Sequence, residues 1–91
     1  MLTLSAIESA VREAAEAYPV SRVYLFGSYV RGTAKDDSDV DFYVEFSRAP
    51  ISLFVYCGFR ATLQRLLGRA VDVVKWQDAD PEEPKVLVYE K

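Results

Sequence analysis

A short segment of the sequence combines residue types suited to binding a metal ion. Asp39 and Asp41 stand one residue apart at the start of an apolar run. If that run is a strand, both carboxylates project on one side, roughly 6–7 Å apart along the chain, because alternate residues share a face. Two like charges this close repel each other unless a cation lies between them. Oxygen-only ligands of this kind favour a hard divalent ion such as Mg²⁺.

A Gly-Ser pair precedes the two aspartates by ten residues and follows another apolar run. Gly27 lets the backbone approach a ligand closely, and Ser28 can open a short helix whose first N–H groups favour phosphate. Each residue alone has an ordinary explanation, a turn at Gly27 or solvated acids at Asp39 and Asp41. Their order and spacing together predict a site for metal-bound nucleotide phosphates.

The elements that must position these residues can be read from the hydrophobic pattern. We expect an α/β (α+β) fold, a small mixed sheet with helices packed on it, in the order α-β-α-β-α-β and as one domain over 1–91. The expected elements are a helix at 4–18 that Ser5 and Glu8 cap and Pro19 ends, a strand at 21–26, a helical turn at 28–31, a strand at 39–46, a helix at 53–67 and a strand at 70–75.

The helix predicted at 53–67 has two apolar sides. The wider one should pack on the sheet and comprises Val55, Tyr56, Phe59, Leu63, Leu66 and Leu67. The second, which we call the outer patch, comprises Leu53, Phe54, Cys57 and Ala61. One small domain rarely covers both, so we expect the outer patch to be buried. The candidates are the run from Val86 to Tyr89, either a strand or an irregular segment, and a partner chain or second copy.

Composition excludes several classes of protein. The 91 residues carry a net charge of −3, which argues against direct nucleic-acid binding through a basic face. One cysteine cannot form an internal disulfide, and without histidine a zinc site is disfavoured. No signal peptide or membrane-length apolar run is present, which predicts a cytoplasmic protein without membrane contact.

The motif G-S-x-x-R-G followed by S-D-x-D resembles the signature of the minimal nucleotidyltransferases of the DNA polymerase beta superfamily. The resemblance covers about residues 4–75, from the leading helix to the third strand, RAVDVV, which contains Asp72. It implies a polymerase-beta-like nucleotidyltransferase core.

The resemblance also implies roles for individual residues. Asp39, Asp41 and Asp72 would be catalytic and would ligate two Mg²⁺ ions, with Mn²⁺ as a substitute. Gly27 and Ser28 would hold the β- and γ-phosphates of the nucleotide. Two assignments stay open at this point: Arg31 is either a phosphate contact or a solvated charge at a helix end, and Asp72 alone would equally pair with Arg69 or Lys75.

The resemblance implies an enzyme that moves AMP, or another nucleoside monophosphate, from ATP or a related triphosphate to a protein hydroxyl. Relatives of this size are often antitoxins that bind a helical HEPN-type toxin and adenylylate it on tyrosine, so a homo- or hetero-oligomer is expected. Two alternatives stay open: a module that neutralises a partner without turnover, and a dimeric enzyme that modifies a small molecule. Pro81 and Pro84 interrupt the family's usual C-terminal helical segment, which leaves the mode of partner binding open.

Overall fold

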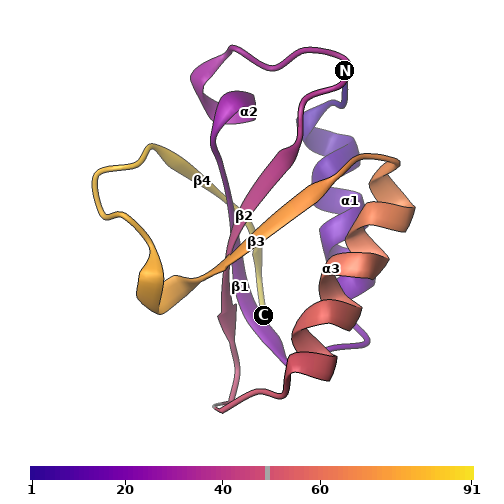
Figure 1. Ribbon diagram of the computed structural model, residues 1–91, viewed down its shortest axis with the longest axis vertical. Helices are drawn as coiled ribbons and strands as arrows, with labels where there is room; N and C mark the ends of the chain where they lie inside the picture. Colours follow the sequence, from indigo (N-terminus) through magenta and orange to yellow (C-terminus); the bar gives the residue numbers. More distant parts are fainter. Residues whose placement is uncertain (49) are drawn as a thin grey trace.

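The computed structural model describes residues 1–48 and 50–91 and shows a four-stranded sheet with two long helices on one face (Figure 1). Along the chain lie α1 (Leu4–Ala15), β1 (Val20–Phe26), α2 (Ser28–Arg31), β2 (Val40–Phe46), α3 (Leu53–Leu67), β3 (Val71–Lys75), the 3₁₀ turn η1 (Trp76–Asp78) and β4 (Lys85–Glu90). The predicted α+β class is confirmed, and β4 extends the predicted order by one strand. Among the described residues, no helix has both the length and the apolar character needed to cross a membrane.

The topology of the sheet brings three separate segments together where the strands end. The strands lie in the order β3-β2-β1-β4, with β1 antiparallel to β2 and β4, and β2 parallel to β3. Asp41 therefore faces Phe26 of β1 on one side and Asp72 of β3 on the other. The end of β1 lies beside the starts of β2 and β3, so the residues predicted to bind phosphate and metal share one location.

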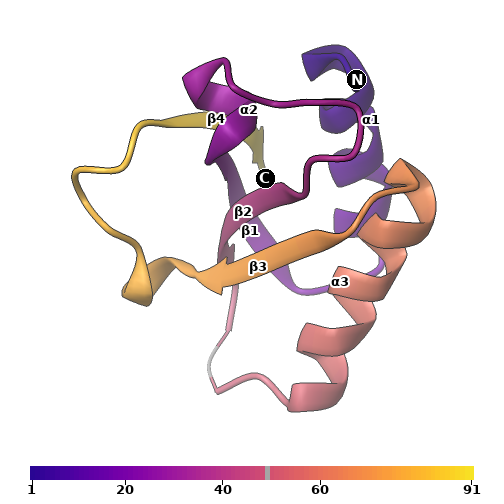
Figure 2. The same cartoon turned by 45° about the horizontal axis from the view of Figure 1, so that its top comes forward.

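The core lies between the sheet and the helices α1 and α3, which Figures 1 and 2 show on the same side of the sheet. Val40, Phe42 and Val44 of β2 are fully buried, as the alternating pattern predicts. The helices contribute Ile7, Val11, Phe59 and Leu63, which are also fully buried. This packing fixes the strand that carries Asp41.

An aromatic layer covers part of the opposite face of the sheet. The rings of Phe26 and Tyr43 stack with centroids 3.8 Å apart, and Tyr24 stacks on Trp76 at 4.6 Å. Tyr43 is only 4% exposed, although the sequence pattern places it on the polar face of β2. The polar character of this face is therefore limited to its ends, one of which carries the predicted site.

The ends of α1 differ from the prediction. Thr3, not Ser5, caps the helix, because its side chain accepts the N–H of Ala6. The helix ends at Ala15, three residues before the predicted end, and turns lead from there to Pro19. Helix α3 follows the prediction at both ends: the Ser52 side chain accepts the N–H of Val55, and Gly68 closes the helix in the left-handed conformation.

The apolar run at the C-terminal end is a strand. β4 pairs with β1 at an outer edge of the sheet, so it does not cover the outer patch of α3. Leu53 is 74% and Phe54 is 89% exposed. The predicted burial of the outer patch by residues 86–89 is therefore wrong, because that run pairs with the free edge of β1 instead.

Candidate active site

Gly27 forms the turn that ends β1 and begins α2. Its φ of +78° and ψ of −148° lie in a region open essentially only to glycine. A Cβ atom here would overlap Oδ2 of Asp41 and lie 3.1 Å from its Cγ. The absence of a side chain at Gly27 therefore lets the turn pass directly against the Asp41 carboxylate.

The short helix α2 follows this turn and carries Ser28 at its start and Arg31 at its end. The amides of Val30 and Arg31 donate to the Gly27 carbonyl, whereas the first amides of a helix, here those of Ser28 and Tyr29, have no partner within it. These two amides and the Ser28 hydroxyl are the polar groups at the start of α2 that could bind a ligand. Arg31 forms an ion pair with Glu83, with 2.9 Å between Nη1 and Oε2.

Asp39 is placed by the loop that leads into β2. The Ser38 hydroxyl accepts the N–H of Lys35 at 2.7 Å, which closes a turn immediately before Asp39. One residue later, the Val40 amide donates to the carbonyl of Ala70, directly before β3. Asp39 is exposed at this junction, and Ser38 has a structural role that its place in the S-D-x-D motif did not reveal.

Asp41 is the partly buried member of the acidic group. Burial raises the pKa of Asp41, and the nearby carboxylates of Asp72 and Asp39 raise it further. Arg31 opposes this rise. Asp72 itself is exposed, flanked by the buried Val71 and Val73, and forms no ion pair with another described residue. Asp41 thus lies against the Gly27 turn and within electrostatic reach of both Asp39 and Asp72.

The chemistry of these donors fits a hard divalent cation. All three side chains are carboxylates, and a bound cation would offset the repulsion that Asp39 and Asp72 exert on the charge of Asp41. Within residues 1–48 and 50–91, however, no three acidic, histidine or cysteine side chains are gathered closely enough to form a ready-made metal cluster. The fit therefore rests on donor type and charge.

The raised pKa of Asp41 predicts an unusual stability profile for the metal-free protein. The folded state holds the proton on Asp41 more tightly than the unfolded state, so stability is lost as the pH rises through the folded pKa. Asp41→Asn removes the disfavoured charge and should raise the melting temperature at pH 7 by about 2–4 °C, and much less at pH 3. The rise is modest because solvent screens part of the repulsion. Thermal unfolding at the two pH values tests this; a destabilised variant at pH 7 would contradict it.

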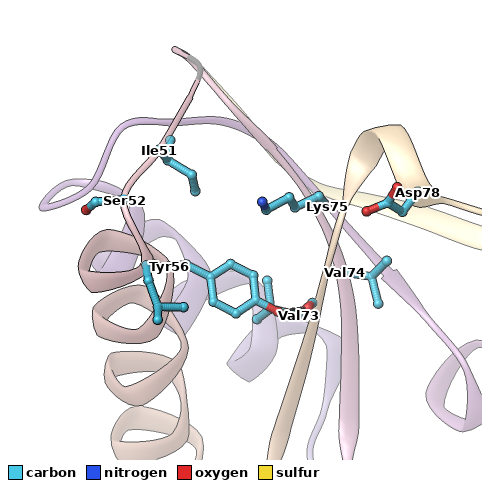
Figure 3. A pocket seen from close by; sticks show the side chains of 8 residues that line it. Ile51, Ser52, Tyr56, Val73, Val74, Lys75 and Asp78 are labelled. Carbon is cyan, nitrogen blue, oxygen red and sulfur yellow. Dashed lines mark hydrogen bonds between the residues drawn. The ribbon is translucent and has the colours of Figure 1, made fainter.

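One hollow of the described residues lies away from the predicted site. A pocket of about 480 Å³ opens between the start of α3 and the outer edge of β3. Figure 3 shows Tyr56 reaching across to the Val73 carbonyl, to which its hydroxyl donates, and Lys75 pointing toward Ile51. Burial and then the Asp72 carboxylate raise the pKa of Tyr56. None of the predicted site residues lines this pocket.

Two features near the site arise from contacts between distant residues. Tyr43 stacks on Phe26 and Trp76 stacks on Tyr24, so all four rings pack against one another on the sheet. Glu83, the partner of Arg31, was not recognised from the sequence. The two residues are 52 positions apart, and the acidic tail offers no local pattern that singles out Glu83.

Comparisons with known proteins identify the family of this chain. Residues 6–91 match the model of the nucleotidyltransferase domain family. The protein adenylyltransferase MntA of Thermococcus cleftensis is 46% identical over 78 residues, which cover 81% of this chain and 78% of the relative.

Solved structures show the same fold. The crystal structure of a toxin–antitoxin with AMP-PNP superposes with a TM-score of 0.75 at 21% identity, covering 92% of this chain and 73% of that chain. A structure of the tri-AMPylated Shewanella oneidensis HEPN toxin in complex with an MNT antitoxin gives a TM-score of 0.69 at 16% identity, covering 98% and 74%. With the family match over residues 6–91, the chain belongs to the nucleotidyltransferase family and is an enzyme of that class.

Proposed function

We propose that this chain transfers AMP from ATP to a hydroxyl group of a protein acceptor in a reaction that requires divalent metal. The observation that carries the proposal is the pairing of Asp41 with Asp72 across two parallel strands, directly beside the Gly27 turn. The relative that is 46% identical is named a protein adenylyltransferase, which favours AMP and a protein acceptor over other choices.

In this proposal the acceptor oxygen attacks the α-phosphorus of ATP, the bond from that phosphorus to its bridging oxygen breaks, and pyrophosphate leaves. Gly27 and Ser28 hold the β- and γ-phosphates, with Arg31 at the same end. Asp72 accepts the proton of the acceptor hydroxyl. The exposed position of Asp72 supports this role, because a protein acceptor must reach it from outside.

Asp39, Asp41 and Asp72 would hold two Mg²⁺ ions, for which Mn²⁺ is a chemical substitute. When bound, such ions neutralise charge on the departing pyrophosphate and favour ionisation of the attacking hydroxyl. The pairing of β2 with β3 fixes the spacing of Asp41 and Asp72 at one end of the strands.

The experiment that tests the proposal uses ATP labelled at the α-phosphate, Mg²⁺ and a lysate of the native host. We expect a labelled protein band, abolished by EDTA and absent when the label is at the γ-phosphate, because AMP transfer retains only the α-phosphorus. The mass of the band identifies the acceptor. Label from γ-labelled ATP would indicate a kinase, and no label from either would favour a binding module without turnover.

We also propose a HEPN-type toxin as the partner and acceptor. The support is a structural neighbour that pairs an MNT antitoxin with an AMPylated HEPN toxin. The outer patch of α3 is a candidate contact, because Leu53 and Phe54 are largely exposed and no described residue covers them.

Phe54→Asp is therefore expected to reduce association with that partner by tenfold or more, since a charge would have to be buried in an apolar contact, at a cost of roughly 2 kcal/mol or more. Light scattering after size exclusion measures the mass of the assembly. Arg65→Asp, in the last turn of the same helix and exposed, serves as a matched control. An unchanged mass for Phe54→Asp would rule out the outer patch as the contact.

A further inference from the structure

We propose that Glu83 positions Arg31 for the nucleotide phosphates, so that the connection between η1 and β4 forms part of the nucleotide site. This inference rests on the proposed function, because it takes Arg31 as a phosphate-binding residue. Glu83 acts through Arg31 and is a positioning residue, not a catalytic one.

The contact joins two distant segments. Nη1 of Arg31 donates to Oε2 of Glu83 at 2.9 Å. The Arg31 side chain is 51% exposed, whereas that of Glu83 is only 21% exposed. The carboxylate is therefore the better-anchored partner, and it holds a guanidinium that would otherwise move freely at the end of α2.

The connection that carries Glu83 is itself held in place. The amides of Glu82 and Glu83 donate to the side chain and carbonyl of Asp80, which forms a closed turn. The Asp80 amide lies 3.4 Å from the hydroxyl of the buried Tyr43, and Nζ of Lys85 donates to the Asp80 carbonyl. Figure 2 shows the connection leaving the sheet after η1 and returning beside α2.

The ion pair leaves Arg31 able to bind a second anion. A guanidinium has five N–H donors, and Glu83 engages it through one nitrogen. Arg31 and Glu83 both act on Asp41, Arg31 lowering and Glu83 raising the pKa of that carboxyl, so both lie within electrostatic reach of the proposed metal site. Fixing the guanidinium beforehand reduces the ordering cost when a phosphate binds.

The test measures binding of Mg·AMP-PNP by titration calorimetry with no acceptor protein present, and KM and kcat for ATP in the transfer assay. Glu83→Gln should raise Kd and KM roughly two- to fivefold with little change in kcat, as expected for loss of one exposed ion pair. In an Arg31→Ala background the same substitution should have no further effect. Glu82→Gln is the matched control, since Glu82 is exposed and outside the ion pairs of the described residues.

Three results would overturn the inference. A lower Kd in Glu83→Gln would make Glu83 a competitor of phosphate for Arg31. An unchanged Kd would make the ion pair irrelevant to binding. An equal rise in the Arg31→Ala background would show that Glu83 acts independently of Arg31. Failure of the wild-type protein to bind nucleotide at all would instead refute the proposed function, and this inference with it.

Discussion

The double variant Asp39→Asn, Asp41→Asn is expected to lose nucleotidyl transfer by about a thousandfold or more, because metal-assisted charge stabilisation contributes several kcal/mol at a phosphoryl centre. Asparagine keeps the shape of each side chain and removes the charge that attracts a cation. The fold should survive, since Asp39 is exposed and the charge of Asp41 is disfavoured in the metal-free protein. Loss of activity with intact folding would therefore report on chemistry.

The measurement is transfer of label from α-labelled ATP, together with the Mg²⁺-induced shift in melting temperature. The wild type should be stabilised by Mg²⁺, and the double variant should not. Asp36→Asn, Asp37→Asn is the matched control, because both residues are exposed acids of the preceding loop. Transfer by the Asp39, Asp41 variant above a tenth of the wild-type rate would exclude these carboxylates as the metal ligands.

The arrangement of the candidate site could be anticipated from the sequence because its residues are encoded locally. Gly27 is marked by the end of an apolar run, and Asp39 and Asp41 are marked by alternation within another. Asp72 required one more step, its place in a third apolar strand. The register that puts Asp72 beside Asp41 follows from a parallel pairing that no local pattern specifies.

The parts that could not be anticipated depend on contacts between distant residues. The apolar run at 86–89 is compatible with several positions: without it both β1 and β3 have a free edge, and the run pairs with β1. Glu83 reaches Arg31 only because that pairing returns the chain to α2. The burial of Tyr43 also depends on a contact between distant residues, because the ring of Phe26 that covers it comes from the neighbouring strand β1.

The second large effect is expected at Gly27. Gly27→Ala places a Cβ atom against the Asp41 carboxylate and forces a backbone conformation that costs alanine about 1–3 kcal/mol. If the turn moves to relieve both, the amides at the start of α2 move away from the phosphates. We therefore expect transfer to fall by about tenfold to a hundredfold, mainly through a higher Kd for Mg·AMP-PNP.

Backbone strain alone would also destabilise the fold, so the control must share the strain and lack the contact. Gly68→Ala meets this need: Gly68 has a φ of +65°, and nothing lies within 4 Å of a Cβ built there. Both variants should lose stability in thermal unfolding, Gly27→Ala the more because of its added overlap with Asp41, whereas only Gly27→Ala should lose nucleotide binding. Equal binding by both would mean that the Gly27 turn does not contact the phosphates, and the approach of this turn to Asp41 would then serve packing of the sheet edge alone.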